Sequence, residues 1–314
     1  MMAGLLGAAA LSGVVYAEEA ELNIAYQYGL AYAPLIVAQD QGLIEAAYEE
    51  ATGETVTVTW TQMSSGADIN TGIAAGELDA GFLGVAPAVT GVMKGVGYKI
   101  FTNLSGQQHG MMTNSEEIKS LSDLVGTDAQ IALVNIGSIQ HIILAKALDE
   151  AGLDAHALDA NIVAMKHPDG MSALLSGSAA AHLTSSPYIF MEQEEEDLYE
   201  IPEVSSAWTV EDSFIVGVAS EELQGENEAL YQALCDGISA AIDYVNENPE
   251  DTAALTCEFD GKTPEEELYY LQKGIYKADT SHVMELAQFM AKSAFIDEAP
   301  EDFHVLAFDN VEGD

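Results

Sequence analysis

The most informative stretch of the sequence is Met63–Pro87, which reads MSSGADINTGIAAGELDAGFLGVAP. Ser64–Gly66 supply hydroxyls and an unhindered backbone just before a predicted helix over Ile69–Ala75. A helix start presents free N–H groups to whatever lies in front of it. The apolar run Ala80–Leu83 predicts a short strand, which Gly84–Pro87 ends before another helix. Open α/β sheets bind small ligands at pairs of such strand-to-helix loops, so we expect a binding site here.

The chain on both sides of this stretch continues the alternation of strands and helices. Strands are predicted over Leu22–Tyr26, Thr55–Trp60 and Lys99–Asn103 because apolar and β-branched residues alternate or cluster there. Apolar residues at helical spacing predict helices over Tyr32–Tyr48 and Ala86–Lys94. This order predicts a mainly parallel sheet covered by helices.

A second α/β unit follows, and the chain then becomes helical. Ser138 is the expected N-cap of a helix that reaches Ala151, and Thr184–Pro187 forms another strand-to-helix loop. The strands expected here are Gln130–Val134, Ile162–Ala164, Ala180–Leu183 and Phe214–Ala219, with a helix over Pro168–Leu175. Beyond them we expect helices alone, over Asn227–Asn248, Asp251–Thr256, Pro264–Gly274 and Ser281–Ala294.

The charge of the chain limits its partners. Nine basic residues stand against 52 acidic ones, giving a net charge of −43, and every basic residue is a lysine. Such a field repels nucleic acid and anionic lipid surfaces, so neither is an expected partner. Arginine is the usual residue for bidentate capture of sulfonate, phosphate or carboxylate. An anionic ligand would therefore depend on helix N-termini, hydroxyls or lysines.

The N-terminus predicts export. Met2–Val15 is almost wholly apolar, and the small residues before position 18 fit cleavage after Ala17, so residues 1–17 are a predicted signal peptide. The mature protein would be periplasmic or extracellular. No lysine precedes the apolar run, which leaves open whether the true start lies upstream. Cys235 and Cys257 could pair in an oxidising compartment or remain free, and the sequence leaves both open.

The order and spacing of several segments resemble the periplasmic substrate-binding proteins of ABC importers. The similarity is to the branch that handles nitrate, sulfonates, taurine and thiamine-pyrimidine precursors. The segments are Ile24–Ile44 (IAYQYGLAYAPLIVAQDQGLI), Ser65–Pro87, Asn135–Ala145 (NIGSIQHIILA) and Val163–Pro187 (VAMKHPDGMSALLSGSAAAHLTSSP). The resemblance implies a two-lobed α/β fold of the type II periplasmic binding protein class. Each lobe would be a mainly parallel sheet flanked by helices, with a helical C-terminal tail.

The same resemblance implies where the lobes and the ligand lie. Lobe one would span residues 22–103 and 217–314, and lobe two residues 104–216. The lobes would close on a ligand like a hinge, and a monomer would deliver that ligand to the permease of an ABC importer. The residues implied to contact the ligand are Gln27, Tyr28, Ser65, Gly66, Gly84, Val85, Ala86, Gly137, Ser138, Thr184 and Ser185.

The residue types support several of these positions and leave alternatives. Tyr28 and Tyr32 could stack on a flat ligand or pack at the surface of a lobe. Ser65 and Ser138 could cap helices, bind ligand through the same helix ends, or do both. His141 lies near a predicted loop and is a further candidate for ligand contact, and Lys166 with His167 is a candidate counter-charge if the ligand is anionic.

Nothing in the sequence predicts catalysis. The chain has no P-loop, nucleophile elbow, H-E-x-x-H or C-x-x-C motif, and its seven histidines lack metal-ligand spacing. We therefore expect no enzyme, cofactor or metal site. The alternative is a metal-dependent enzyme of the thiamine-pyrimidine synthesis type on the same fold, which would need clustered histidines. The charge favours a neutral or zwitterionic ligand, such as an aminopyrimidine or taurine, over nitrate or a simple alkanesulfonate.

Overall fold

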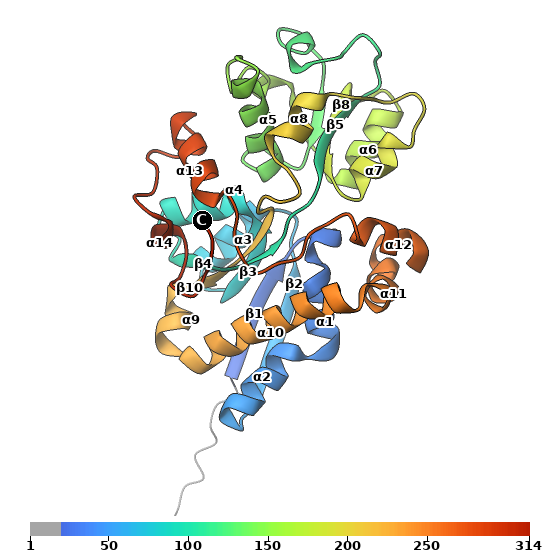
Figure 1. Ribbon diagram of the computed structural model, residues 1–314. Coiled ribbons are helices and arrows are strands. Elements are labelled where there is room, and N and C mark those ends of the chain that lie inside the picture. Colours follow the sequence, from blue (N-terminus) through green and yellow to red (C-terminus); the bar gives the residue numbers. More distant parts are fainter. Residues whose placement is uncertain (1–19) are drawn as a thin grey trace, which may run out of the picture.

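The computed structural model describes residues 20–314, apart from the side chains of 259 and 260. It contains two five-stranded sheets, each flanked by helices, and Figure 1 shows them as two separate bodies joined by crossing segments. The expected two-lobed α/β architecture is confirmed. We call the part built on the first sheet the first lobe and the part built on the second sheet the second lobe. The predicted signal peptide lies outside the described residues.

The first sheet is mainly parallel, as expected. Its order is β2-β1-β3-β10-β4, and β1 pairs in parallel with both β2 and β3. β10 returns from much later in the chain and pairs antiparallel with β3 and β4, so the other strands share one direction. The strands are β1 (Ala20–Tyr26), β2 (Val56–Gln62), β3 (Ala80–Gly84), β4 (Tyr98–Ser105) and β10 (Ile215–Ser220).

The second sheet repeats this plan with one reversed strand. Its order is β7-β6-β8-β5-β9, and β6 pairs in parallel with β7 and β8. β5 pairs antiparallel with β8 and β9 and is the reversed strand. The strands are β5 (His109–Thr113), β6 (Ile131–Leu133), β7 (Ile162–Ala164), β8 (Ala181–Ser185) and β9 (Tyr199–Glu200).

Helices flank both sheets, and the C-terminal helices pack against the first lobe (Figure 1). The N-terminal segment of the first lobe contributes η1 (Leu30–Tyr32), α1 (Ala33–Gln41), α2 (Leu43–Thr52), α3 (Gly66–Ala74) and α4 (Val85–Met93). The second lobe contributes η2 (Leu121–Asp123), α5 (Ile139–Glu150), η3 (Asp159–Asn161), α6 (His167–Leu175), α7 (Tyr188–Gln193) and α8 (Pro202–Ala207). The C-terminal part contributes α9 (Glu221–Glu226), α10 (Glu228–Glu247), α11 (Pro249–Asp260), α12 (Pro264–Leu271), α13 (Val283–Lys292) and α14 (Phe303–Leu306).

The core of the first lobe explains why β10 carries a glycine at its centre. The rings of Phe82 on β3 and Phe101 on β4 are buried, with centroids 5.7 Å apart in an edge-to-face contact. Gly217 lies against this pair, and a Cβ atom there would come within 2.7 Å of both rings. Close packing of this kind leaves no room for a larger residue. The glycine therefore lets the returning strand enter between β3 and β4.

Two segments cross between the lobes, after β4 and before β10, and a third segment from the C-terminal part braces them. Gly106 exchanges backbone hydrogen bonds with Ile275, at 2.8 and 2.9 Å. A Cβ atom on Gly106 would lie 2.0 Å from the carbonyl oxygen of Val210, so only glycine fits. The backbones of the three segments thus pack directly against one another in the connection between the lobes, which we call the hinge.

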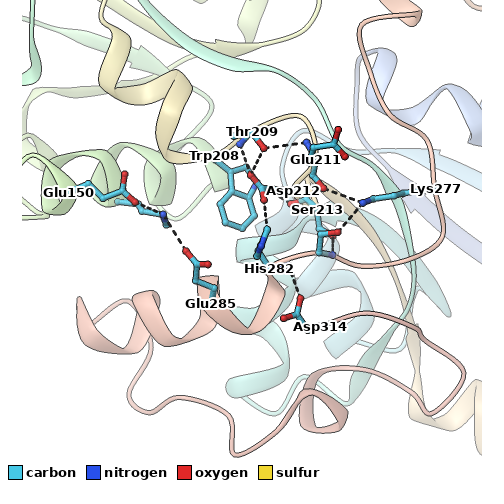
Figure 2. Close-up of polar contacts among 12 residues, drawn as sticks. Glu150, Trp208, Thr209, Glu211, Asp212, Ser213, Lys277, His282, Glu285 and Asp314 are labelled. Atoms are coloured by element: carbon cyan, nitrogen blue, oxygen red, sulfur yellow. Dashed lines mark hydrogen bonds and ion pairs between the residues drawn. The ribbon is translucent and has the colours of Figure 1, made fainter.

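Side-chain hydrogen bonds fix the second crossing segment, as Figure 2 shows. The carboxylate of Asp212 accepts from the Thr209 hydroxyl at 2.9 Å and pairs with His282 Nδ1. The ammonium group of Lys277 donates to the Glu211 carbonyl at 3.2 Å and to the Ser281 hydroxyl at 2.9 Å. The chain that enters α13 is therefore tied directly to the hinge.

Some sequence-based predictions were wrong in detail. The single helix expected over Tyr32–Tyr48 is two helices, because Gly42 takes a left-handed conformation with φ of 59°. Strand β5 was not predicted, since His-Gly-Met-Met-Thr has few β-branched residues. Helices α8, α9 and α14 were also missed, as was the short β9, and the extent of α7 after the predicted Thr184–Pro187 loop was not predicted.

Both cysteines are free: Cys257 is buried, and burial raises the pKa of the Cys235 thiol to about 12.

Within residues 20–314, no helix is both long and apolar enough to cross a membrane.

Candidate ligand-binding cleft

A cavity of about 980 Å³ lies between the lobes and is lined by residues from both of them. The first lobe contributes the loop after β1, the start of α3 and the end of β3 with parts of α4. The second lobe contributes the loop before α5, the first turns of α6 and the loop that enters α7. Its volume is that of a site for a small organic molecule.

Four helices point their N-termini at this cavity. Gly66 opens α3, Gly84 is the N-cap of α4, Ser138 is the N-cap of α5, and Lys166 is the N-cap of α6. All four residues line the cavity. The unpaired N–H groups of a helix start favour an acceptor or an anionic group in front of them. Two lobes each supplying two such ends can hold one polar group from both sides.

Glycines bring the backbone close to the cavity. A Cβ atom on Gly66 would lie 2.8 Å from Cγ of Pro87, and one on Gly84 would lie 3.0 Å from Cγ2 of Ile139. Gly137 has a positive φ of 83°, which side-chain-bearing residues rarely adopt. The tight turns that expose the helix starts therefore depend on these glycines.

Eight of the thirteen predicted site residues line the cavity, and five do not. Those that line it are Gln27, Tyr28, Tyr32, Gly66, Gly84, Gly137, Ser138 and Ser185. Those outside the lining are Ser65, Val85, Ala86, His141 and Thr184. The predicted loops are thus brought together, and five of the predicted residues lie beside the cavity without lining it.

The residues outside the lining have their polar groups engaged elsewhere. Ser65 caps α3, accepting from the Asp68 N–H at 3.2 Å and donating to its carboxylate at 2.8 Å. His141 is buried: its Nδ1 accepts from the Gly137 N–H at 3.0 Å, and its Nε2 bonds Asp159 at 2.9 Å. His141 therefore supports the loop from behind. Val85 and Ala86 are fully buried beneath the start of α4.

Sequence reasoning missed much of the apolar lining. These residues are Ile136, Ile139, Ile142, Met171, Leu175, Tyr188, Met191, Phe214 and Phe295. Tyr188 and Met191 lie on α7, whose extent was not predicted, and Phe295 follows α13, far from the other loops in sequence. No local pattern marks such residues, because their place in the site depends on how the lobes pack.

The lining is basic although the chain is strongly acidic. Three of the nine lysines line the cavity (Lys94, Lys166 and Lys262), and Glu266 is the single acidic residue that does so among the described residues. The ammonium group of Lys166 in the second lobe lies 5.1 Å from the ring centroid of Tyr28 in the first lobe. This cation–π contact spans the cavity between the lobes.

Further contacts join the lobes beside the cavity and form what we call the interlobe latch. Lys292 at the end of α13 pairs with Asp149 on α5, with N–O distances of 2.6 and 2.9 Å. Glu285 on α13 pairs with Lys146 on α5 at 3.4 Å, and Figure 2 draws this contact as a dashed line from the labelled Glu285. The latch residues are Glu285, Lys292, Ser293 and Phe295 on one side and Lys146, Asp149 and His156 on the other.

A buried polar cluster lies behind the second-lobe wall. The hydroxyl oxygen of Thr184 is 2.9 Å from Nδ1 of His167, and Nε2 of His182 is 3.4 Å from the same atom. Nδ1 of His182 hydrogen-bonds Oε1 of Glu192 at 2.5 Å. Burial raises the pKa of Glu192 to about 8, and it lowers the pKa of both histidines to about 3. The cluster is therefore neutral near pH 7.

No group of three or more histidine, cysteine, aspartate or glutamate residues that could hold a metal ion occurs among residues 20–314. The clustered histidines required by the enzyme alternative are thus not found in the described part of the chain. His167 and His182 do lie together and hydrogen-bond each other. Glu192 bonds the other side of His182, and Thr184 bonds His167.

The family is established by comparison. Residues 16–259 match the model of the NMT1-like family, so the chain belongs to that family. The resemblance to substrate-binding proteins of the nitrate and sulfonate branch is confirmed at the level of family and fold. No curated protein sequence matches the chain.

Solved structures with the same fold include two sulfonate-binding proteins. The alkanesulfonate-binding protein SsuA from Xanthomonas axonopodis pv. citri, bound to MOPS, has a TM-score of 0.73 at 16% identity, covering 95% of this chain and 100% of that one. The periplasmic aliphatic sulphonate-binding protein SsuA from Escherichia coli has a TM-score of 0.70 at 18% identity, covering 94% of each chain. The Candida albicans CA3427 gene product, described as having the generic periplasmic binding protein fold, has a TM-score of 0.70 at 13% identity, covering 91% and 93%.

Proposed function

We propose that this protein is an exported solute-binding protein that delivers a small organic molecule to an ABC importer without changing it chemically. The observation that carries the proposal is the cavity between the lobes, at which four helix N-termini from both lobes converge. A ligand held by both lobes favours the closed arrangement, which a permease can distinguish from the open one. The two sulfonate-binding proteins of the same fold support the same role.

The ligand class follows from two opposing charge effects. The net charge of −43 disfavours anions, as the sequence predicts, whereas Lys94, Lys166 and Lys262 create a local attraction for an anionic group. A zwitterion of the taurine type fits both conditions, since it carries an anionic group and no net charge. The apolar and aromatic residues of the lining would accommodate the rest of the molecule. Within the family range we therefore favour taurine-like zwitterions, followed by neutral aminopyrimidine-like compounds, which the net charge does not repel.

A thermal-shift panel on ligand-stripped protein tests this function. The protein is partially unfolded and refolded to remove any carried ligand, then heated with taurine, alkanesulfonates, nitrate, aminopyrimidines and divalent metals. A ligand at 100 times its dissociation constant stabilises the folded state by about 2.7 kcal/mol, which raises the midpoint measurably. A shift with one organic class supports the proposal and identifies the ligand class. A shift with metals alone would contradict it and favour a metal-dependent function.

The proposal also covers the setting of the protein. We expect it to act as a monomer outside the cytoplasmic membrane, with an importer permease as its macromolecular partner. Gel filtration with light scattering on the mature chain checks the oligomeric state against the 33.3 kDa mass calculated for the whole chain. N-terminal sequencing of the exported protein checks the predicted cleavage after Ala17.

A further inference from the structure

The polar cluster behind the cavity contains a fully buried carboxyl group with a histidine as its one hydrogen-bond partner among the described residues. Glu192 is fully buried, its Oε1 bonds His182, and its Oε2 is without a hydrogen-bond partner among the described residues. An ionised carboxylate held by one hydrogen bond in such a place is strongly disfavoured. The acid form is favoured near neutral pH, and its proton lies in the hydrogen bond to Nδ1 of His182.

The position of that proton determines the proton positions along the cluster. With Nδ1 of His182 accepting from Glu192, the ring hydrogen of neutral His182 sits on Nε2. Nε2 faces Nδ1 of His167 at 3.4 Å, and two N–H groups cannot share a hydrogen bond. Nδ1 of His167 is therefore an acceptor, and the Thr184 hydroxyl at 2.9 Å can donate to it as well. The ring hydrogen of His167 must then be on Nε2. Moving the proton from Glu192 to His182 leaves this result unchanged.

Neighbouring residues pack closely against the rings of His182 and His167. Gly170 on α6 lies against His182, and a Cβ atom at Gly170 would come within 2.5 Å of its Nε2. Tyr188 flanks the His167 ring at 5.7 Å with an interplanar angle of 30°. His167 also lines the cavity. Since Nδ1 is turned to the buried cluster, the N–H on the cavity side of the ring is available to a ligand.

We propose that His167 contacts the ligand by donating a hydrogen bond from its neutral Nε2–H to an acceptor oxygen, and that Glu192 acts through His182 as the positioning residue that fixes this tautomer. The inference rests on the proposed function of the cavity and deepens it. It specifies an uncharged donor, in addition to the lysines and helix ends, for a sulfonate or carboxylate oxygen. It also makes ligand recognition depend on one buried carboxyl group.

Ionisation of Glu192 exchanges donor and acceptor in each hydrogen bond from Glu192 through His182 to His167. Nδ1–H of His182 then donates to the carboxylate, Nε2 of His182 accepts from Nδ1–H of His167, and Nε2 of His167 becomes an acceptor that repels an anionic oxygen. Ligand binding should weaken as the pH rises through about 8. The neighbouring titratable groups are Lys166, His167 and Asp169 of α6 and its N-cap, Tyr188 of α7, His109 of β5 and His182 of β8. Burial and His167 lower the pKa of His109 to about 3, so its charge is constant in this range.

Nitrogen-detected NMR of the histidine rings in ligand-free protein tests the tautomer directly. The seven histidines are labelled, and a His167→Gln variant assigns the signal of interest. We expect the Nε2–H tautomer of His167 at pH 6.5 and a change to Nδ1–H with a midpoint near pH 8. In the matched variant Glu192→Gln, whose amide donates at every pH, the Nε2–H form should persist to pH 9.5. An Nδ1–H tautomer at pH 6.5, or the same transition in Glu192→Gln, would overturn the proposal. The wild-type titration decides this even if the variant does not fold.

A measurement of ligand affinity separates failure of the His167 contact from failure of the proposed function. Ethanesulfonate serves as the probe because its charge is constant over this pH range. Its affinity for the wild type should fall about tenfold or more between pH 6.5 and 9.5, as expected for a lost hydrogen bond to a charged group, and Glu192→Gln should remove most of this dependence. A pH-independent affinity overturns the contact. An NMR transition without binding of any organic compound in the panel overturns the proposed function itself.

Discussion

The interlobe latch allows a prediction about how the lobes are held together. The double variant Glu285→Gln with Lys292→Met removes both ion pairs between α13 and α5 without changing the net charge. The matched control is Glu117→Gln with Lys119→Met, which makes the same chemical change at exposed positions of the second lobe away from the latch. We expect the first variant to populate more open arrangements and the control to behave as the wild type.

The size of the effect follows from exposure of the pairs. The relative exposures of the side chains are 64% and 34% for Lys292 and Asp149, and 12% and 56% for Lys146 and Glu285. Ion pairs this exposed contribute about 0.2–1 kcal/mol each, so the two together contribute about 0.4–2 kcal/mol. The equilibrium between separated and joined lobes should therefore shift about 2- to 30-fold toward separation.

Small-angle X-ray scattering of ligand-free protein at about 20 mM salt measures this shift, because attraction between partly exposed charges is little screened there. We expect a larger radius of gyration for the latch variant than for the control. Equal scattering curves for the latch variant, the control and the wild type would refute the view that these pairs hold the lobes together.

Three further predictions concern packing, pH and the thiols. Gly170→Ala would force a buried ring aside and should destabilise the fold by about 1–3 kcal/mol, whereas Gly225→Ala meets no atom within 4 Å and should be neutral or stabilising in thermal unfolding. The pKa of His156 is raised by the Ser293 carbonyl across the lobes and by Asp159, so the stabilisation from its charged form should be complete below pH 6.5 and be lost as the pH rises through the folded-state pKa, which NMR titration measures. Denatured protein should show both Cys235 and Cys257 as titratable thiols without reductant, and a single disulfide would contradict the free state.

Many strands, helices and helix caps could be predicted from the sequence because they depend on local patterns. Strand β7 (Ile162–Ala164) has the predicted bounds, and Ser138 caps α5 as expected, accepting from the His141 N–H at 3.3 Å. Apolar periodicity and capping residues act over a few positions, so a single chain reveals them. The order of strand-to-helix loops also placed most of the predicted binding residues around one cavity.

The sequence could not predict what arises from contacts between distant segments. Thr184 faces His167 behind the wall, whereas its neighbour Ser185 lines the cavity, because successive residues of a strand point to opposite faces. The net charge favoured a neutral or zwitterionic ligand, and it could not show that folding gathers three of the nine lysines around the cavity. Phe295 reaches the cavity only because α13 packs beside α5.

Calorimetric titration of the compound identified by the thermal-shift panel tests most directly whether the ligand lies between the lobes. It compares the wild type with Tyr28→Ala from the first lobe, Lys166→Met from the second lobe, and the control Lys119→Met outside the cavity. We expect each cavity variant to weaken binding about tenfold or more, corresponding to about 1.4 kcal/mol, and the control to bind as the wild type does. Unchanged affinity in both cavity variants, or a loss confined to one lobe, would contradict binding between the lobes.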